Sequence, residues 1–271
     1  MNSSCLLENG PLRLKRCRHG LMLYLITDKY VGRSLDLYGE FSDGEIDVLR
    51  QLIRPGATVL EVGANIGSHT VSLAKATGPS GSVFVFEPQR LIFQILCANL
   101  ALNALANVYT HRAAVGRKAG ASVVPKIDPT SPNNFGGVSL GDWPEGEPVP
   151  VMTIDSLGLA ACHLIKIDVE GMESDVIAGA EQTIRRFRPV LYLENDQPEK
   201  SAALIRQIMA LDYRLYWHRP PMFNAENYFG VSDNIFPGIF SINMLCLHAS
   251  WQHDVTGLRE ILKPEDRWQD S

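Results

Sequence analysis

Between residues 58 and 196, short apolar runs alternate with segments of helical pattern, and this alternation is the feature that most limits the folds open to the chain. Several of the runs, such as 82–86 and 189–193, are apolar almost throughout. Strands of that kind are buried on both faces, as in a parallel sheet covered by helices. The sequence therefore predicts an α/β fold.

The flanking segments follow other patterns. Residues 1–50 carry strand-like runs at 21–26 and 34–41 and a helical run at about 43–53, so we interpret 1–50 as an N-terminal strand and helix cap. Residues 51–250 form the main domain, and 251–271 form a C-terminal tail. Two late strand-like runs, joined by an insert at about 218–240, predict an antiparallel pair at the sheet edge. Proline and glycine in 117–150 predict a long loop with one hairpin.

Composition excludes several classes of protein. The net charge of −5 and the lack of a dense basic cluster argue against a nucleic-acid partner. The basic run at 13–20 is expected to be a solvated strand or hairpin. Five cysteines without C-x-x-C spacing suggest neither zinc nor disulfides. The apolar runs fall short of the roughly 20 residues of a membrane span, and the N-terminus lacks a signal peptide's apolar centre, so we expect a cytoplasmic protein.

The stretch VLEVGANIGSHT, residues 59–70, places a glycine turn at the carboxyl end of the first core strand, where open α/β sheets bind ligands. Glycine lets a chain turn tightly and approach a ligand without a Cβ clash. The dinucleotide pattern G-x-G-x-x-G fails, because Asn65 and Ser68 stand where it needs glycine. No Gly-Lys-Ser/Thr follows, so a phosphate loop is excluded too. An ordinary strand-to-helix turn is the alternative.

Two glutamates make a cofactor the better interpretation of this turn. Glu87 ends the second strand, twenty residues after Gly67, where a carboxylate can accept hydrogen bonds from both ribose hydroxyls of a nucleoside. Glu61, just before the turn, would oppose a pyrophosphate but suits a ligand that carries an ammonium or sulfonium cation. The ligand that fits best is S-adenosylmethionine.

The predicted cofactor contacts lie at the ends of the first four core strands. A simple turn explains residues 114–116 nearly as well as a contact with adenine, and a helix cap or packing explains His69 better than catalysis does. The predicted set is Glu61, Gly63, Asn65, Gly67, His69, Thr70, Glu87, Pro88, Ala114, Val115 and Asp168.

The fourth strand ends in HLIKIDVEGMESDVIAGA, residues 163–180. With VLEVGANIGSHT, VFVFEP and PVLYLEN, this motif resembles the FkbM family of S-adenosylmethionine-dependent methyltransferases over about residues 36–250. The resemblance implies a Rossmann-like class I methyltransferase fold, with a mostly parallel seven-stranded sheet in the order 3-2-1-4-5-7-6 and helices on both faces. It also implies methyl transfer, commonly to hydroxyls of macrolides or of sugars in glycans and glycolipids.

Methyl transfer to a hydroxyl needs an aligned acceptor and a group that takes its proton. The catalytic candidates are Asp168, Glu194, Lys166 and Glu170. Asp168 serves equally well as a cofactor-positioning residue, and His218 is better explained as a loop residue than as a base. The carboxylates offer the hard oxygen ligands that Mg²⁺ prefers, but no metal site is predicted from them. The aromatics Trp217, Phe223, Tyr228 and Phe229 suit stacking on a sugar, and packing explains them equally.

The sequence thus predicts O-methylation of a hydroxyl on a sugar, a glycan or a secondary metabolite. N-methylation of a small-molecule amine and non-catalytic S-adenosylmethionine binding are the alternatives, and a nicotinamide oxidoreductase is disfavoured by the failed glycine spacing. The expected partner is a small molecule or glycan, with a homodimer left open. The acceptor, and whether 117–150 or 218–240 forms a lid, are not determined by the sequence.

Overall fold

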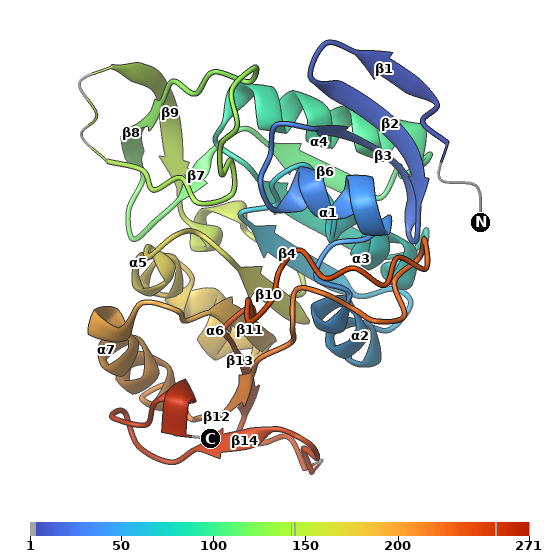
Figure 1. Cartoon of the computed structure of the whole chain (residues 1–271). Helices are drawn as coiled ribbons and strands as arrows, with labels where there is room; N and C mark the ends of the chain where they lie inside the picture. The colour runs from blue at the N-terminus through green and yellow to red at the C-terminus, as the bar shows by residue number, and fades with distance from the viewer. Residues whose placement is uncertain (1–3, 142, 144, 253, 271) are drawn as a thin grey trace.

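The computed structural model describes residues 4–141, 143, 145–252 and 254–270. An eight-stranded sheet in the order β14-β12-β13-β11-β10-β4-β5-β6 runs through its centre, with helices on both faces (Figure 1). The strands are β4 (Thr58–Val62), β5 (Ser82–Phe86), β6 (Val108–His111), β10 (Leu164–Ile167), β11 (Val190–Glu194), β12 (Tyr213–His218), β13 (Asn243–His248) and β14 (Arg259–Ile261).

The sheet is mixed. Strands β6, β5, β4, β10 and β11 pair in parallel, whereas β13 is antiparallel to both β11 and β12, and β14 is antiparallel to β12. The predicted α/β fold and the antiparallel pair at one side are therefore confirmed. The predicted number of seven strands is wrong, because residues 259–261 of the expected tail extend the sheet beyond β12 as an eighth strand.

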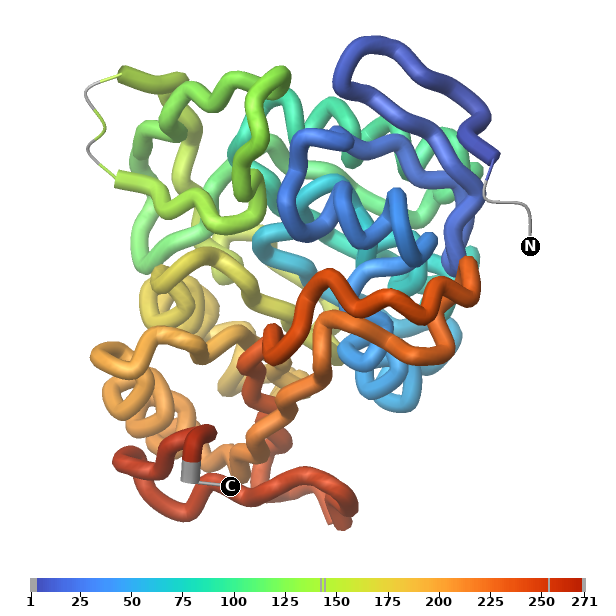
Figure 2. The backbone as a smooth tube through the Cα atoms, viewed as in Figure 1, coloured from blue at the N-terminus to red at the C-terminus, as the bar shows by residue number. Residues whose placement is uncertain are grey.

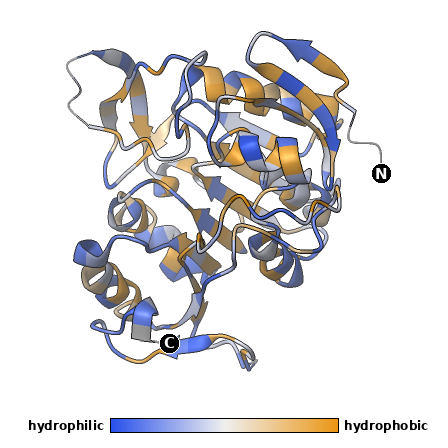
Figure 3. Cartoon of the chain, viewed as in Figure 1, coloured by the Kyte–Doolittle hydropathy of each residue, from blue (hydrophilic) through white to orange (hydrophobic). Residues whose placement is uncertain are grey.

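In the part of the chain that the structure describes, three helices pack on each face of the sheet. One apolar cluster joins the strands to α2 (Asp43–Leu52), α3 (Thr70–Thr77) and α4 (Arg90–Leu102). A second joins them to α5 (Glu173–Ala178), α6 (Glu181–Phe187) and α7 (Pro198–Met209). The helices show mixed hydrophobic and hydrophilic colouring, as expected when one side of each is buried (Figure 3). Burial on both faces leaves the strand ends as the place for polar chemistry.

The N-terminal cap consists of β1 (Leu7–Asn9), β2 (Leu12–Cys17) and β3 (Gly20–Leu25), followed by α1 (Val31–Tyr38). The basic run at 13–20 forms the β2–β3 hairpin, as predicted. Strand β3 packs on α4, where Asn99 accepts a hydrogen bond from the Leu23 amide and donates to the Leu23 carbonyl. The cap is thereby joined to the main sheet layer.

The predicted strand at 34–41 is wrong, because most of it lies in α1. The cause is upstream, where the Asp28 carboxylate accepts hydrogen bonds from the amides of Tyr30 and Val31 and so satisfies the first turn of the helix. Val31, Leu35 and Tyr38 then fall on one buried face at helical spacing. The helix expected at about 43–53 is confirmed as α2.

The 117–150 loop contains the predicted hairpin, in which β8 (Gly120–Pro125) pairs with β9 (Gly146–Met152). Strand β7 (Ala114–Val115) adds to β9 in parallel. Two short 3-10 helices lie at Ile154–Leu157 and Trp268–Asp270. Among the helices that the structure describes, none is both long and apolar enough to cross a membrane.

Candidate functional site

A cleft of about 370 Å³ opens at the carboxyl ends of the parallel strands. Among the described residues, the predicted ones that line it are Glu61, Gly63, Asn65, His69, Glu87, Pro88, Ala114, Val115, Lys166, Asp168, Glu170 and Glu194. Two predicted residues, Gly67 and Thr70, are absent from its lining. The ends of β4, β5, β10 and β11 thus bring together residues more than a hundred positions apart (Figure 1).

The two glycines of the turn serve the protein's own packing. Gly63 has φ +85°, and a Cβ there would lie 1.7 Å from the Asp168 carbonyl oxygen. Gly67 has φ +84°, and a Cβ there would meet the Leu96 side chain at 2.7 Å. The close approach that Gly63 allows is therefore between the ends of β4 and β10. That contact places Asp168 beside the glycine turn.

Glu87 is buried and held by backbone amides. One carboxylate oxygen accepts from the Asn65 amide at 3.1 Å and the other from the Gln89 amide at 2.8 Å. Burial raises the pKa of Glu87 to about 7, although the two amide bonds act in the opposite direction. The carboxylate is fixed in orientation and lines the cleft.

A network of charged side chains lines the cleft. Lys166 is 2% exposed, and its Nζ lies 3.0 Å from Oδ2 of Asp168. Burial acts against its charge, but Asp168, Glu45 and Glu61 outweigh that effect and raise the pKa of Lys166. Burial raises the pKa of Glu61 to about 7, and its carboxylate accepts the Thr70 hydroxyl at 2.6 Å. Thr70 thus acts on the site through Glu61.

His69 is 4% exposed and precedes α3 without a side-chain capping bond. Its ring stacks on Phe41 at 5.7 Å between centroids. Burial, together with the nearby charge of Lys166, lowers the pKa of His69 to about 4, so the ring is neutral near pH 7. Its Nε2 is buried without a hydrogen-bond partner in the described part of the chain.

Carboxylates gather at the ends of β10 and β11. Burial raises the pKa of Glu170 to about 7 and raises the pKa of Glu194 well above its usual value. The negative charges of Asp168 and Asp196 are the next largest causes in both cases. Glu170 has φ +53°, a left-handed conformation that turns the chain away after β10. Glu173 instead accepts hydrogen bonds from the amides of Val169 and Gly171. Glu173 therefore supports the turn.

The outer walls come from segments outside the sheet, and the sequence had indicated these segments but not the residues. Residues of the insert, of the 117–150 loop and of the cap all line the cleft. The sequence features that could have indicated these wall residues are a glycine pair in the loop and the apolar end of the insert. The residues missed include Tyr30, Phe41, Asn134, Met222, Ile239 and Phe240.

The four aromatics, for which stacking on a ligand and packing were equally good explanations, pack within the protein. Trp217 contacts Trp268, and Phe223 contacts Tyr38. Tyr228 and Phe229 lie close to Gly39. His218 is likewise outside the cleft lining, and its Nδ1 lies 2.8 Å from the Tyr192 hydroxyl. The packing explanation of the aromatics is the one that the geometry favours.

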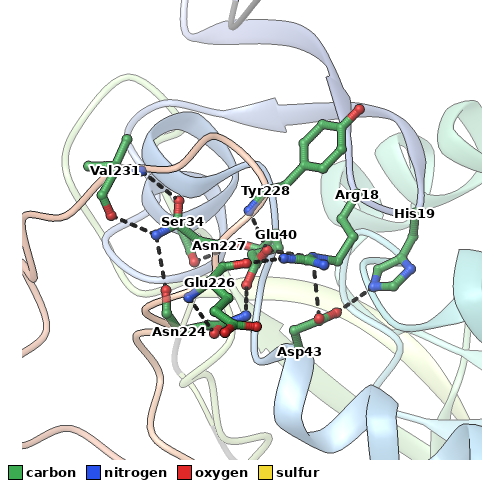
Figure 4. A network of polar contacts seen from close by, with 10 residues as sticks. All are labelled: Arg18, His19, Ser34, Glu40, Asp43, Asn224, Glu226, Asn227, Tyr228 and Val231. Atoms are coloured by element: carbon green, nitrogen blue, oxygen red, sulfur yellow. Dashed lines mark hydrogen bonds and ion pairs between the residues drawn. The ribbon is translucent and has the colours of Figure 1, made fainter. Parts of the chain in front are cut away.

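The insert is fastened to the cap by a polar network centred on Glu40 (Figure 4). This carboxylate, 4% exposed, accepts from Arg18 Nε at 2.6 Å, from Asn224 Nδ2 at 2.9 Å and from the Tyr228 amide at 2.7 Å. Arg18 also donates to the Glu226 carbonyl. Figure 2 shows the insert running beside the cap helices α1 and α2. The cap thus holds one wall of the cleft.

Within the described ranges, no three His, Cys, Asp or Glu side chains form a group that could hold a metal ion. The cleft instead offers small apolar residues at 113–115 next to a fixed carboxylate at Glu87. This combination suits an adenosine, whose base is flat and apolar and whose ribose donates hydroxyls.

Comparison with known proteins gives a family match. The methyltransferase FkbM domain matches residues 61–215. The methyltransferase sdnD of Sordaria araneosa is 26% identical over 164 residues, which cover 46% of this chain and 60% of that protein. The chain therefore spans about 60% of the length of this curated relative.

Solved structures of similar shape include a methyltransferase FkbM from Methylobacillus flagellatus KT. It is 17% identical, with a TM-score of 0.49, and the match covers 81% of this chain and 55% of that one. A SAM-dependent O-methyltransferase from Thermotoga maritima is 12% identical, with a TM-score of 0.47 and coverage of 91% and 81%.

Proposed function

This chain belongs to the methyltransferase FkbM domain family, and from that premise we propose that it is an S-adenosylmethionine-dependent O-methyltransferase. Its acceptor is a hydroxyl on a small molecule, a sugar or a glycan. The observation that carries the proposal is the buried, amide-held carboxylate of Glu87 in a cleft at the ends of the parallel strands.

In this proposal each part of the cleft has a separate task. Glu87 accepts the ribose hydroxyls, while Pro88, Ala114 and Val115 flank the adenine. Asn65 and His69 lie towards the amino-acid end, with Asp168 held in place by Lys166. S-adenosylmethionine supplies an electrophilic methyl group when bound. The carboxylates of the cleft favour its sulfonium charge.

The chain's own chemical contribution is alignment and proton removal. Glu194 lies at the end of β11, and its raised pKa gives it more affinity for a proton than an ordinary glutamate has. As the acceptor oxygen bonds to the methyl carbon, the carbon–sulfur bond breaks and its electrons stay on sulfur. The hydroxyl proton passes to Glu194. Glu170 then orients the acceptor beside it.

Calorimetric titration with S-adenosylhomocysteine tests the proposal. We expect micromolar binding, at least a tenfold loss in Glu87→Ala, and no binding of NAD. Glu181→Ala is the matched control, because Glu181 is an exposed glutamate that pairs with Arg185 outside the cleft. Preference for NAD would refute the assignment of the cofactor. Binding without methyl transfer to any hydroxyl or amine acceptor would favour a non-catalytic binding protein.

A further inference from the structure

The cleft has a strong imbalance of charge. Among the described residues, Lys166 is the only lysine or arginine that lines it. Against this single cation stand Glu61, Glu87, Asp168, Glu170, Glu194 and Asp196. Where these carboxylates are ionised, the cleft attracts cations, because charges of one sign in a confined cleft raise the local concentration of the opposite sign. A bound cation in turn favours the ionised form of Glu170 and Glu194, whose pKa values burial has raised.

Three of these carboxylates already form hydrogen bonds or an ion pair within the protein. Glu87 accepts two backbone amides, Asp168 pairs with Lys166, and Glu61 accepts the Thr70 hydroxyl. These three lie on the side of the cleft that the proposed function gives to the cofactor. Their charges are therefore balanced, or hydrogen-bonded, before any acceptor arrives.

The other three are Glu170, Glu194 and Asp196, which we call the acidic rim. Among the described residues, none of the three has a lysine, arginine or histidine within salt-bridge distance. The positive charge of Lys200 acts to lower the pKa of Asp196. Its Nζ, however, donates a hydrogen bond to the Gly171 carbonyl and not to Asp196. Glu194 also keeps Oε2 buried with no hydrogen-bond partner in the described chain.

A further unpartnered polar atom lies in the lining of the cleft. His69 is 4% exposed, and its Nε2 is buried with no hydrogen-bond partner among the described residues. Around both groups, Tyr30, Phe41, Met222 and Phe240 supply apolar walls. The cleft therefore combines unpartnered polar groups with apolar surface, as a small-molecule site does.

We propose that the acidic rim binds an ammonium group of the methyl acceptor, so that the acceptor is an amine-bearing polyol or similar cationic compound. This inference rests on the proposed function, because the proposed function places Glu170 and Glu194 beside the methyl acceptor. A metal ion is a poorer occupant, because no metal-holding group is found among the described side chains. The unpaired carboxylates of the acidic rim disfavour a phosphate or carboxylate group placed beside them.

The test uses the whole 271-residue chain saturated with S-adenosylhomocysteine, which fills the cofactor side of the cleft. Two matched ligands are then titrated, glucosamine, which carries an ammonium group, and glucose, which is neutral. We expect glucosamine to bind at least tenfold more tightly than glucose. In the double variant Glu170→Gln, Asp196→Asn, that ratio should fall below twofold while S-adenosylhomocysteine binding stays unchanged.

The control variant is Glu181→Gln, which removes an exposed carboxylate outside the cleft and should leave the ratio intact. Equal affinity for the two ligands in the unaltered protein would overturn the inference. So would a preference that survives the double substitution. Failure of the unaltered protein to bind S-adenosylhomocysteine would instead refute the proposed cofactor, and the two failures are therefore distinguishable.

Discussion

At the scale of single residues, the site depends on carboxyl groups whose proton affinity is changed by burial. Glu61, Glu87 and Glu170 each have a pKa raised to about 7, and burial is the largest cause in each. A glutamate on the surface would be ionised well below neutral pH. These three therefore change charge in the range where the protein is assayed.

Cofactor binding should depend on pH through Glu87. An acid with a raised pKa is ionised only above that pKa, so the form that accepts two ribose hydroxyls grows as pH rises through about 7. S-adenosylhomocysteine should bind up to about tenfold more weakly at pH 6 than at pH 8, because only about a tenth of the carboxyl is ionised one unit below its pKa. Calorimetry at the two pH values measures this ratio.

Glu87→Gln separates this effect from the titration of Glu61 and Glu170. The variant should bind weakly at both pH values, with a ratio near one. A pH dependence that persists in Glu87→Gln would assign the titration to another carboxyl group.

Gly63→Ala should destabilise the fold. The new Cβ would meet the Asp168 carbonyl oxygen at 1.7 Å, and φ of +85° is unfavourable for any residue with a side chain. Strain and overpacking together predict a loss of about 2–5 kcal/mol in unfolding free energy. Gly10→Ala is the control, since Gly10 also has positive φ but nothing within 4 Å of a new Cβ. Urea denaturation should show a clearly larger loss for Gly63→Ala than for the control.

At the scale of elements, the cleft has one half built by the sheet and one half built by segments that the cap holds in place. Tyr38 accepts the Ile235 amide and donates to the Asp233 carbonyl, and Glu40 binds three groups. On the other side, Asn133 of the loop exchanges backbone hydrogen bonds with Thr27 and Lys29. Both outer walls therefore depend on residues 1–50.

Glu40→Ala should loosen the insert without affecting the cofactor half. Three donors, Arg18 Nε, Asn224 Nδ2 and the Tyr228 amide, would lose a buried acceptor. Hydrogen exchange at residues 224–235 should accelerate at least tenfold, while S-adenosylhomocysteine affinity changes less than twofold. Glu226→Ala is the matched control, because Glu226 accepts Arg18 through its backbone carbonyl, which the substitution retains. Unchanged exchange in Glu40→Ala would show that the network does not hold the insert.

At the scale of the whole molecule, the cap shares its apolar core with the main domain. Tyr24, Met22 and Leu25 of the cap are buried with Ile92 and Ile95 of α4. Each such side chain contributes about 1.5–3 kcal/mol when buried, so five of them approach the roughly 5–15 kcal/mol of a whole domain. We propose that residues 1–50 and the main domain unfold together.

A chain that begins at residue 42 should therefore fail to fold. Calorimetric unfolding of the full chain should give one transition, with the calorimetric and van't Hoff enthalpies equal. Two separate transitions, or a truncated chain that keeps a cooperative transition, would show that the cap is an independent unit.

Elements whose signals are local can be predicted from the amino-acid sequence alone. The apolar runs gave the core strands, and the spacing of Gly63, Gly67 and Glu87 placed a turn and a carboxylate at neighbouring strand ends, since period and turn chemistry depend on adjacent residues. Tertiary structure decided the rest. The strand predicted at 34–41 became α1 because of Asp28, and β14 joined the sheet because β12 had a free edge. The outer walls and the raised pKa values arise from contacts between segments far apart in the chain, and burial of that kind is not encoded in any local pattern.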